Sequence, residues 1–322
     1  MTLTKKQLGI YLDDSISNDL ISVDGIIFDC DGVLIDITKS YDLTIDKTVK
    51  YVLENFFQIT DNIKIDSKII DGFKSSGGFN DEVDLTYASI LSLVAAKKLN
   101  KPQNEFIFDV ISNADSSGIL SVEKYIGKLV DIDDIKNKLS YPGTHNDNSL
   151  YQIFDQLFYG PVLYHKIFKQ NSEFIEPGLI DNDKVIMTNE LLSVLAKKFG
   201  NKIGIVTGRG LESIRYSLKN ILDGFDVQNS AFLEDEPREM AKPNPESLIR
   251  TISGMKCKNI IYVGDSMEDL IMARKSTQMG YDTIFCGIIG TSKNPQAKLE
   301  MFRQNGANLV LDSIQLLPLL LK

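Results

Sequence analysis

The second half of the chain alternates short apolar runs with longer amphipathic segments. Apolar runs of strand length occupy residues 203–206, 260–263, 283–289 and 308–311. Apolar residues at helical spacing predict helices over residues 188–199, 211–222 and 267–274. Strands that alternate with helices of this length are typical of a doubly wound parallel sheet with helices on both faces. We therefore predict an α/β fold for this half of the chain.

The segment between residues 38 and 176 has a different pattern. Its apolar residues form two stripes at helical spacing, Ile45, Val49, Val52, Leu53 and Phe56 and then Tyr87, Ile90, Leu91, Val94 and Ala95. Strand-like alternation is scarce. The segment follows an early apolar run at 26–28 and ends near Pro177. We predict a mostly helical domain inserted into a core made of residues 1–37 and 177–322.

Two acidic residues follow the first apolar run. Asp29 and Asp31 come directly after Phe28, and Gly32 follows them. Side chains two residues apart on a strand point to the same side, so the two carboxylates are directed at one place. Carboxylates held together repel each other and lose hydration, so the pair needs a cation or a proton. The pair suits a site where one carboxylate attacks and the other moves a proton, although an acidic turn after a strand has the same composition.

A hydroxyl, a glycine and two cations follow later strands. Thr207, Gly208 and Arg209 come after the run at 203–206. The Thr207 hydroxyl can donate to a phosphate oxygen, and the Gly208 N–H, near a helix N-terminus, can bind an anion. Arg209 can hold the loop or reach a substrate, while a helix cap and a turn explain the same residues. Lys242 precedes a proline and is either a fixed cation over the sheet edge or an ordinary surface lysine.

A further strand ends in acids. Asp265, Ser266 and Asp269 follow the run at 260–263. Ser266 and Asp269 have the spacing of a helix capping box, which explains both without a metal. The capping box does not explain Asp265 at the strand tip, where a carboxylate that faces Asp29 would complete an oxygen site for Mg²⁺. Because ligands bind beyond the carboxyl ends of parallel strands, we expect these segments to meet at one edge of the sheet.

Composition narrows the function classes. The net charge of −9 argues against non-specific nucleic-acid binding, which needs a basic surface. The apolar runs fall short of the roughly 20 residues that span a bilayer, which argues against a membrane partner. Cys30, Cys257 and Cys286 are far apart and fit neither a metal motif nor a disulfide framework. We therefore expect a cytoplasmic protein.

In their order along the chain, these motifs resemble those of the haloacid dehalogenase superfamily. The motifs that carry the resemblance are Asp29-x-Asp31, Thr207-Gly208-Arg209, Lys242-Pro243 and Gly264-Asp265-Ser266-x-x-Asp269. The resemblance covers the first strand and most of residues 179–311. It implies a Rossmann-like core with an inserted helical cap, similar to the type-one cap of phosphoglycolate-phosphatase-like members. The segment Glu176-Pro177-Gly178-Leu179 resembles the exit from such a cap.

The sequence departs from this pattern at two points. The insert is longer than such caps usually are, and an unusual N-terminal extension precedes the first strand. Within the insert, the loop from Ser75 to Asp81 resembles a substrate-specificity loop, although an interhelical turn fits it equally well.

The resemblance implies phosphoryl transfer, because phosphatases and phosphomutases carry an acid at the position of Asp31. By this analogy Asp29 attacks phosphorus, and Asp31 acts as general acid and then as general base. Thr207 and Lys242 would stabilise the transferring group. The implied Mg²⁺ ligands are Asp29, the backbone carbonyl of Asp31, Asp265 and, in support, Asp269. The implied substrate-binding residues are Thr207, Gly208, Arg209 and Asn80.

The expected function is a Mg²⁺-dependent phosphatase for a small phosphorylated metabolite, acting through an aspartyl-phosphate in a monomer or homodimer. A sugar-phosphate mutase shares the motifs and the helical cap, and nothing in the residues decides between the two. A non-catalytic binding or regulatory protein on this scaffold would have lost at least one catalytic residue. Such a loss is not seen at Asp29, Asp31, Lys242 or Asp265.

Overall fold

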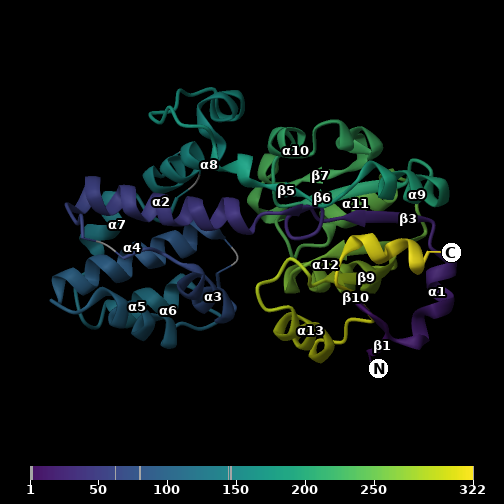
Figure 1. Cartoon of the computed structure of the whole chain (residues 1–322), viewed down its shortest axis with the longest axis horizontal. Helices are drawn as coiled ribbons and strands as arrows, with labels where there is room; N and C mark the ends of the chain where they lie inside the picture. Colours follow the sequence, from purple (N-terminus) through teal and green to yellow (C-terminus); the bar gives the residue numbers. More distant parts are fainter. Residues whose placement is uncertain (1–2, 62, 80, 144, 146, 322) are drawn as a thin grey trace. The chain divides into compact units, whose positions relative to one another are not determined.

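The computed structural model describes residues 3–61, 63–79, 81–143, 145 and 147–321 (Figure 1). The chain divides into two compact units, which we name the core unit (Met1–Thr38 with Asp183–Lys322) and the helical unit (Lys39–Asn182). The limits given above for the insert, residues 38 and 176, and its role as a cap stay predictions.

The core unit contains an eight-stranded sheet with the order β1-β2-β10-β9-β8-β3-β6-β7. Its strands are β1 (Thr4–Gln7), β2 (Ile10–Leu12), β3 (Gly25–Phe28), β6 (Ile203–Thr207), β7 (Ala231–Phe232), β8 (Asn259–Gly264), β9 (Asp282–Ile288) and β10 (Leu309–Leu311). Neighbouring strands from β10 to β7 are parallel, whereas β1 and β2 form an antiparallel hairpin at one edge. The predicted α/β fold is confirmed, and the hairpin is an addition that the sequence pattern did not predict.

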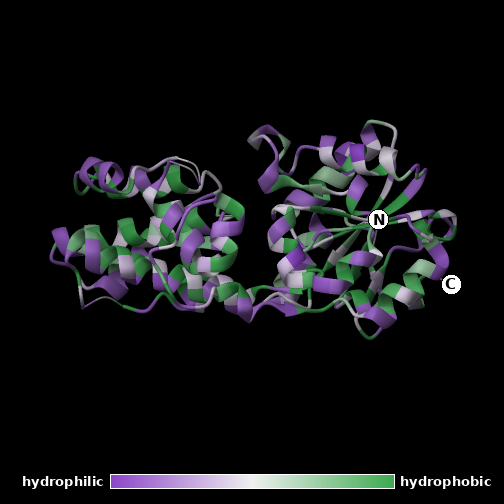
Figure 2. Cartoon of the chain, turned by 90° about the horizontal axis from the view of Figure 1, so that it is seen from above, coloured by the Kyte–Doolittle hydropathy of each residue, from purple (hydrophilic) through white to green (hydrophobic). Residues whose placement is uncertain are grey.

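The sheet is covered on both faces, because alternating residues of β3 enter two different cores. Ile26 and Phe28 pack with one set of helices and Ile27 packs with the other. The first set is α1 (Ser17–Ser22), α9 (Asn189–Phe199) and α10 (Leu211–Leu218), and the second is α11 (Glu246–Gly254), α12 (Met267–Gln278) and α13 (Pro295–Gln304). Figure 2 shows the hydrophobic strands between helices that carry hydrophilic positions.

Most predicted elements of the core unit match the structure closely. The strand expected at 260–263 is β8, and the helix expected from residue 267 is α12. The helix expected over 211–222 is shorter, since α10 ends at Leu218 and a 3₁₀ segment, Lys219–Gly224, follows it. Two short strands, β4 (Ile35–Asp36) and β5 (Lys184–Val185), form a separate antiparallel pair.

The helical unit contains α2 (Thr38–Phe57), α3 (Ser67–Ser75), α4 (Glu82–Lys98), α5 (Gln103–Ser112), α6 (Ile119–Ile126), α7 (Asp133–Leu139) and α8 (Ser149–Phe168). Both predicted apolar stripes pack in its core. Helix α4 is buried on all sides, rather than along one stripe. Ser89 and Ser92 fit this core because their hydroxyls donate to carbonyls one turn earlier.

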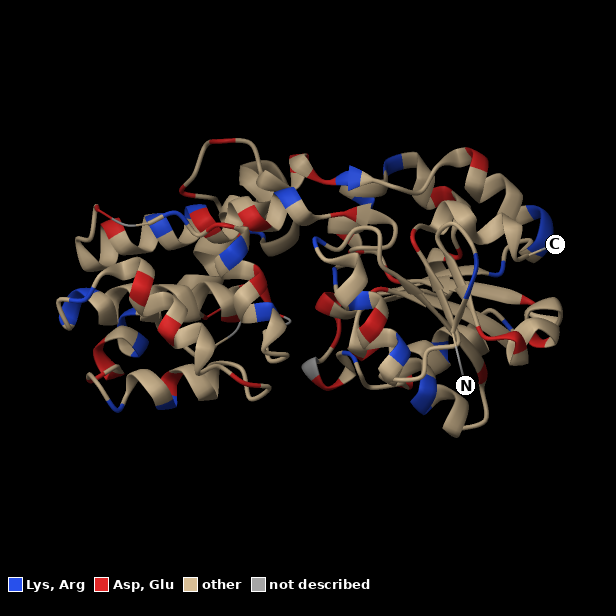
Figure 3. Cartoon of the chain, turned by 60° about the horizontal axis from the view of Figure 1, so that its bottom comes forward, with Lys and Arg blue, Asp and Glu red and all other residues tan. Residues whose placement is uncertain are grey.

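Charged residues of both signs lie along the helices and loops of each unit (Figure 3). Within the described ranges, every helix is too short or too polar to cross a membrane. The expected absence of nucleic-acid and membrane partners stays a prediction.

Candidate active site

Three neighbouring parallel strands bring the sequence motifs to one edge of the sheet. The strands β8, β3 and β6 are adjacent, and their carboxyl ends share that edge. Asp29 follows β3, Thr207 ends β6 and Asp265 follows β8. The order of the strands therefore places these three residues where ligands of open α/β sheets bind.

The loop after β3 is held tightly in place. The Asp29 N–H donates to the Val263 carbonyl at 2.8 Å, and the Cys30 N–H donates to Asp29 Oδ1 at 2.7 Å. Gly32 turns the loop with a φ of 73°. A Cβ at this position would lie 2.3 Å from Asp265 Oδ2, so only glycine lets the loop approach Asp265 this closely.

Lys242 joins two of the buried acids. Its Nζ lies 2.9 Å from Asp29 Oδ1 and 2.7 Å from Asp269 Oδ1, and its side chain is 9% exposed. Burial alone would lower the pKa of Lys242, but the carboxylates of Asp269 and Asp29 outweigh it and hold that pKa well above its usual range. Lys242 is thus a fixed cation at the sheet edge, not a surface lysine.

Asp269 has the capping role that its spacing predicted. Ser266 and Asp269 form the capping box of α12, in which Asp269 Oδ2 accepts from the Ser266 N–H and Ser266 Oγ accepts from the Asp269 N–H, each at 3.1 Å. The other carboxylate oxygen of Asp269 accepts from the Tyr262 hydroxyl at 2.8 Å and from Lys242. Burial raises the pKa of Asp269, but the Lys242 ammonium and the hydrogen bonds from Ser266 and Tyr262 together outweigh this effect and lower the pKa. Asp269 therefore caps a helix and orients Lys242 at the same time.

The carboxylates of Asp29, Asp265 and Asp269 form a cluster that fits a divalent cation. One oxygen from each lies within 4.8 Å of the others. Mg²⁺ prefers such hard oxygen ligands, and it is bound in other proteins by one or two carboxylates with water and phosphate oxygens. The described acids therefore suit Mg²⁺, while a ligand role for the backbone carbonyl of Asp31 stays a prediction.

The environment of Asp29 disfavours its charged form, even with the Lys242 ammonium beside it. Burial raises the pKa of Asp29 to about 8, against the opposing effect of Lys242, and the carboxylates of Asp269, Asp265 and Asp31 add to the rise. A divalent cation among these acids would favour the ionised carboxylate.

Arg209 holds Asp31 rather than projecting from the surface. Its Nε lies 2.8 Å from Asp31 Oδ1, and its Nη1 lies 2.8 Å from Asp183 Oδ2. Arg209 is only 4% exposed, and Nη1 also donates to Ser217. Of the two roles considered for Arg209, the structure shows the one in the loop, and a substrate contact stays a prediction.

Thr207 is fully buried at the end of β6. Its Oγ1 accepts from the Arg209 N–H at 3.4 Å, and its side chain contacts the Cys30 thiol. Burial raises the pKa of that thiol well above its usual range, and Asp29 and Asp31 raise it further. Cys30 is therefore an uncharged packing residue, and the donation from Thr207 to phosphate stays a prediction.

The N-terminus of α10 is already occupied by acidic side chains. The Gly210 N–H donates to Glu234 and the Leu211 N–H donates to Asp235, each at 2.8 Å. These donors are therefore engaged within the protein. Gly208 is exposed before the helix, with open space beside its Cα, and its contact with an anion stays a prediction.

The loop from Ser75 to Asp81 packs as an interhelical turn in its described part. Phe79 is buried against Phe73, with ring centroids 5.1 Å apart. Asn80, the substrate-binding residue expected in this loop, lies outside the described residues.

Sequence reasoning missed Lys298 and Asp183. Lys298 Nζ lies 2.6 Å from Asp265 Oδ2, and Asp183 binds Arg209. Lys298 lies on α13, which follows the carboxyl end of β9, so the rule that pointed to Asp265 could have pointed to it. No sequence signal marks Asp183.

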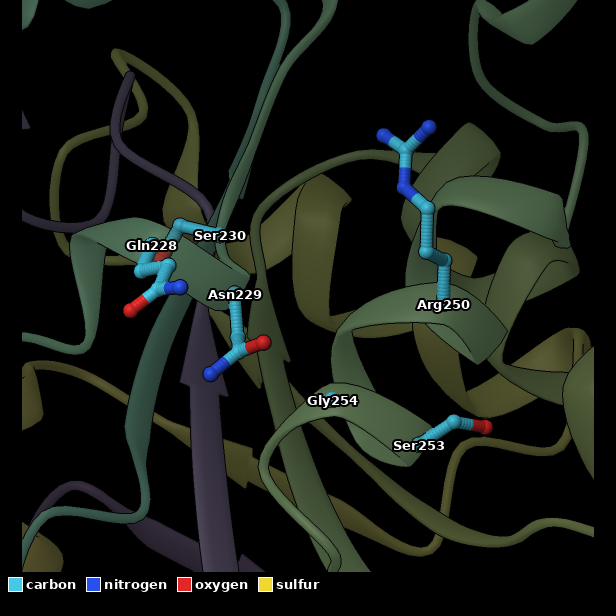
Figure 4. A pocket seen from close by; sticks show the side chains of 6 residues that line it. All are labelled: Gln228, Asn229, Ser230, Arg250, Ser253 and Gly254. Carbon is cyan, nitrogen blue, oxygen red and sulfur yellow. The ribbon is translucent and has the colours of Figure 1, made fainter.

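A pocket of about 490 Å³ lies away from these residues (Figure 4). It is lined by Gln228, Asn229, Ser230, Arg250, Ser253 and Gly254. Ser230 directly precedes β7 and Gly254 ends α11, so the pocket is at the amino ends of the strands. The acids lie at the carboxyl ends of the strands, so the pocket is at the other end of the strands, and we do not assign the chemistry to it.

The chain is similar to several known proteins. Residues 176–277 match the model of the haloacid dehalogenase-like hydrolases. Phosphatase Tt82 from Thermococcus thioreducens is similar over 87% of this chain and 99% of its own, with 23% identity and a TM-score of 0.55. A putative haloacid dehalogenase-like hydrolase from Bacteroides fragilis is similar over 87% and 93%, with 18% identity and a TM-score of 0.46. These likenesses concern the fold alone, and no curated protein matches the chain.

Proposed function

We propose that this chain is a haloacid dehalogenase-like hydrolase, and that it acts as a Mg²⁺-dependent phosphatase on a small phosphate monoester. The observation that carries the proposal is the approach of Lys242 to Asp29 beside the carboxylates of Asp265 and Asp269. A nucleophile, a fixed cation and a set of oxygen ligands then lie together at the carboxyl edge of the sheet. Phosphoryl transfer needs such positioning and charge stabilisation.

In the first step, the Asp29 carboxylate attacks phosphorus and the bond to the ester oxygen breaks. The Cys30 N–H and the Lys242 ammonium orient this carboxylate through Oδ1. Lys242 also offsets negative charge on the phosphoryl oxygens as they approach. The product of this step is an aspartyl-phosphate and a free alcohol.

Asp31 supplies the proton that the leaving oxygen needs. It lies two residues after the nucleophile, and Arg209 holds its carboxylate in place. In the second step Asp31 takes a proton from water, which attacks the aspartyl-phosphate and releases inorganic phosphate. Asp31 thus returns to its starting protonation state at the end of the cycle.

Asp29 and Asp265 would hold the metal, with Asp269 within reach. Bound Mg²⁺ would screen the repulsion between the Asp29 carboxylate and the phosphate. The phosphoglycolate-phosphatase-like assignment rests on the resemblance of the motifs and of the helical insert. The proposed cytoplasmic location of the protein rests on its three widely spaced cysteines.

A panel of phosphorylated metabolites tests the proposal. The wild type should release inorganic phosphate from at least one of them with Mg²⁺, lose this activity in EDTA and regain it with excess Mg²⁺. Asp29→Asn should keep the fold and lose turnover, because an amide cannot form the phosphoenzyme. Wild-type turnover by Asp29→Asn would exclude the mechanism, and isomer formation without phosphate release would identify a mutase instead.

A further inference from the structure

Lys298 is a cation beside the candidate metal ligands, and it belongs to none of the sequence motifs. Its Nζ lies 2.6 Å from Asp265 Oδ2. The two side chains are 16% and 25% exposed, so water screens their pair only in part. Lys298 also lies beyond the residues 176–277 that match the family model.

The fold fixes Lys298 at this position. Helix α13 begins at Pro295. The preceding residue, Asn294, caps the helix, because its side chain accepts a hydrogen bond from the Ala297 N–H. Leu299 on the next position is buried in the core, which sets the rotation of the helix. The loop before α13 is held against the loop after β3, since the Thr291 hydroxyl donates to the Gly32 carbonyl at 2.7 Å.

Each acid of the cluster has an ammonium partner within the protein. Asp29 and Asp269 share Lys242, whereas Asp265 has Lys298. A divalent cation at this cluster must either displace the Lys298 ammonium from Asp265 or share the carboxylate with it. In both cases the positive charge of Lys298 opposes that of the incoming cation.

We infer that Lys298 is a built-in counter-ion that competes with Mg²⁺ for Asp265 and so weakens the affinity of the site for the metal. This inference rests on the proposed function, because it requires the acidic cluster to bind Mg²⁺. Lys298 is a positioning residue that acts through Asp265. In the metal-free protein it offsets the repulsion among the carboxylates, and on metal binding this contribution is lost.

A purely structural role would have the opposite effect. If Lys298 only holds Asp265 in the orientation that the metal needs, its removal would disorder the ligand and weaken Mg²⁺ binding. The sign of the change in affinity therefore separates the two roles, without reference to turnover.

Titration calorimetry with MgCl₂, in the absence of substrate and at low ionic strength, tests the inference on the full chain. Lys298→Met should bind Mg²⁺ with a Kd about five- to tenfold lower than that of the wild type, because one opposing charge is removed. Lys298→Arg keeps the charge and should stay near the wild type. Arg303→Met is the matched control, since it removes a charge from the same helix where the partner is Glu300.

Thermal unfolding gives a second readout. In EDTA, Lys298→Met should melt below the wild type, because Asp265 has lost its counter-ion. Saturating Mg²⁺ should reduce the difference in melting temperature, since the bound metal then offsets the negative charge of the carboxylates. Lys298→Gln serves the same comparison if the methionine variant does not fold.

Unchanged or weaker Mg²⁺ binding by the uncharged variants would overturn the inference. If the wild type still binds Mg²⁺ and releases phosphate in that case, the proposed function stands. If the wild type binds no Mg²⁺ at all, both the inference and the proposed function fail.

Discussion

The ammonium of Lys242 lies 2.9 Å from Asp29 Oδ1, although the two residues are far apart in the sequence. The same ammonium lies 2.7 Å from Asp269, whose carboxylate is fully buried. One cation therefore stabilises two acids that have little contact with water. Such a cation has a structural role as well as the catalytic role that we propose.

Replacement of Lys242 by methionine should lower both stability and activity. The variant leaves two buried carboxylates without their cation, a loss that typically costs about 3–5 kcal/mol of unfolding free energy. Proton uptake by Asp29 will reduce this cost, since burial already raises its pKa to about 8. Urea unfolding and phosphate release measure the two effects.

Lys197→Met on α9 is the control for this experiment, because its side chain is exposed. It should change neither quantity appreciably. If Lys242→Met matched the wild type in stability and turnover, Lys242 would be neither the structural nor the catalytic cation that we describe.

Asp31→Asn should reduce turnover by about 10²–10⁴-fold, the usual contribution of a general acid or base. The loss in the first step should depend on the leaving group. An alkyl phosphate needs its leaving oxygen protonated, whereas p-nitrophenolate leaves readily without a proton. Comparison of the pre-steady-state rates at which the alcohol and p-nitrophenolate are released measures this difference. An equal loss of the first step for both would argue against Asp31 as the acid.

Much of this site could be predicted because strand ends are local features of the sequence. An apolar run followed by an acid marked Asp29 and Asp265, and the parallel sheet brings such ends together. The capping box was also readable, since Ser266 and Asp269 are three residues apart. In these cases the residues that predict the feature are the same neighbouring residues that form it.

The remaining features depend on contacts between distant segments. Lys298 reaches Asp265 only because α13 packs beside β9, and an isolated lysine on a helix carries no such information. One of the partners of Arg209 is Asp183, which lies 26 residues earlier and which no sequence motif marks. The β1–β2 hairpin could not be predicted either, because the residues of β1 are exposed and polar and have no apolar pattern.

Gly32→Ala should disrupt the site through backbone and side-chain effects together. A positive φ costs a non-glycine residue about 1–2 kcal/mol, and the added Cβ would meet Asp265 Oδ2 at 2.3 Å. We expect lower stability, weaker Mg²⁺ binding and loss of turnover. Titration calorimetry measures Mg²⁺ binding, and a phosphate-release assay measures turnover.

Gly280→Ala is the matched control, because Gly280 has a φ of 92° and no atom within 4 Å of an added Cβ. It should show only the part of the stability loss that comes from the positive φ, and it should keep its metal affinity. If Gly32→Ala bound Mg²⁺ as well as Gly280→Ala does, the close approach of Gly32 to Asp265 would have no part in metal binding.

Asp24 joins the beginnings of β3 and β8, and its contribution to stability should depend on pH. Its Oδ1 accepts from the Lys258 and Asn259 N–H groups at 2.9 and 3.0 Å, and Lys202 Nζ lies 2.7 Å from Oδ2. Partial burial raises the pKa of Asp24, but Lys202 and the two N–H groups outweigh it and lower the pKa from its ordinary value of 3.8. The folded state therefore binds this proton more weakly than the unfolded state does.

Because the pKa is lower in the folded state, the charged carboxylate stabilises the fold above the unfolded pKa and loses this effect as pH falls through the folded value. Asp24→Asn should cost about 1 kcal/mol at pH 7, since the pair is partly screened by water. The difference in unfolding free energy between wild type and variant should stay constant down to about pH 5 and shrink as the pH falls below the unfolded pKa of 3.8. Urea unfolding across this range measures it. A difference that grew on acidification would mean that Asp24 gains protons on folding, contrary to the contacts described.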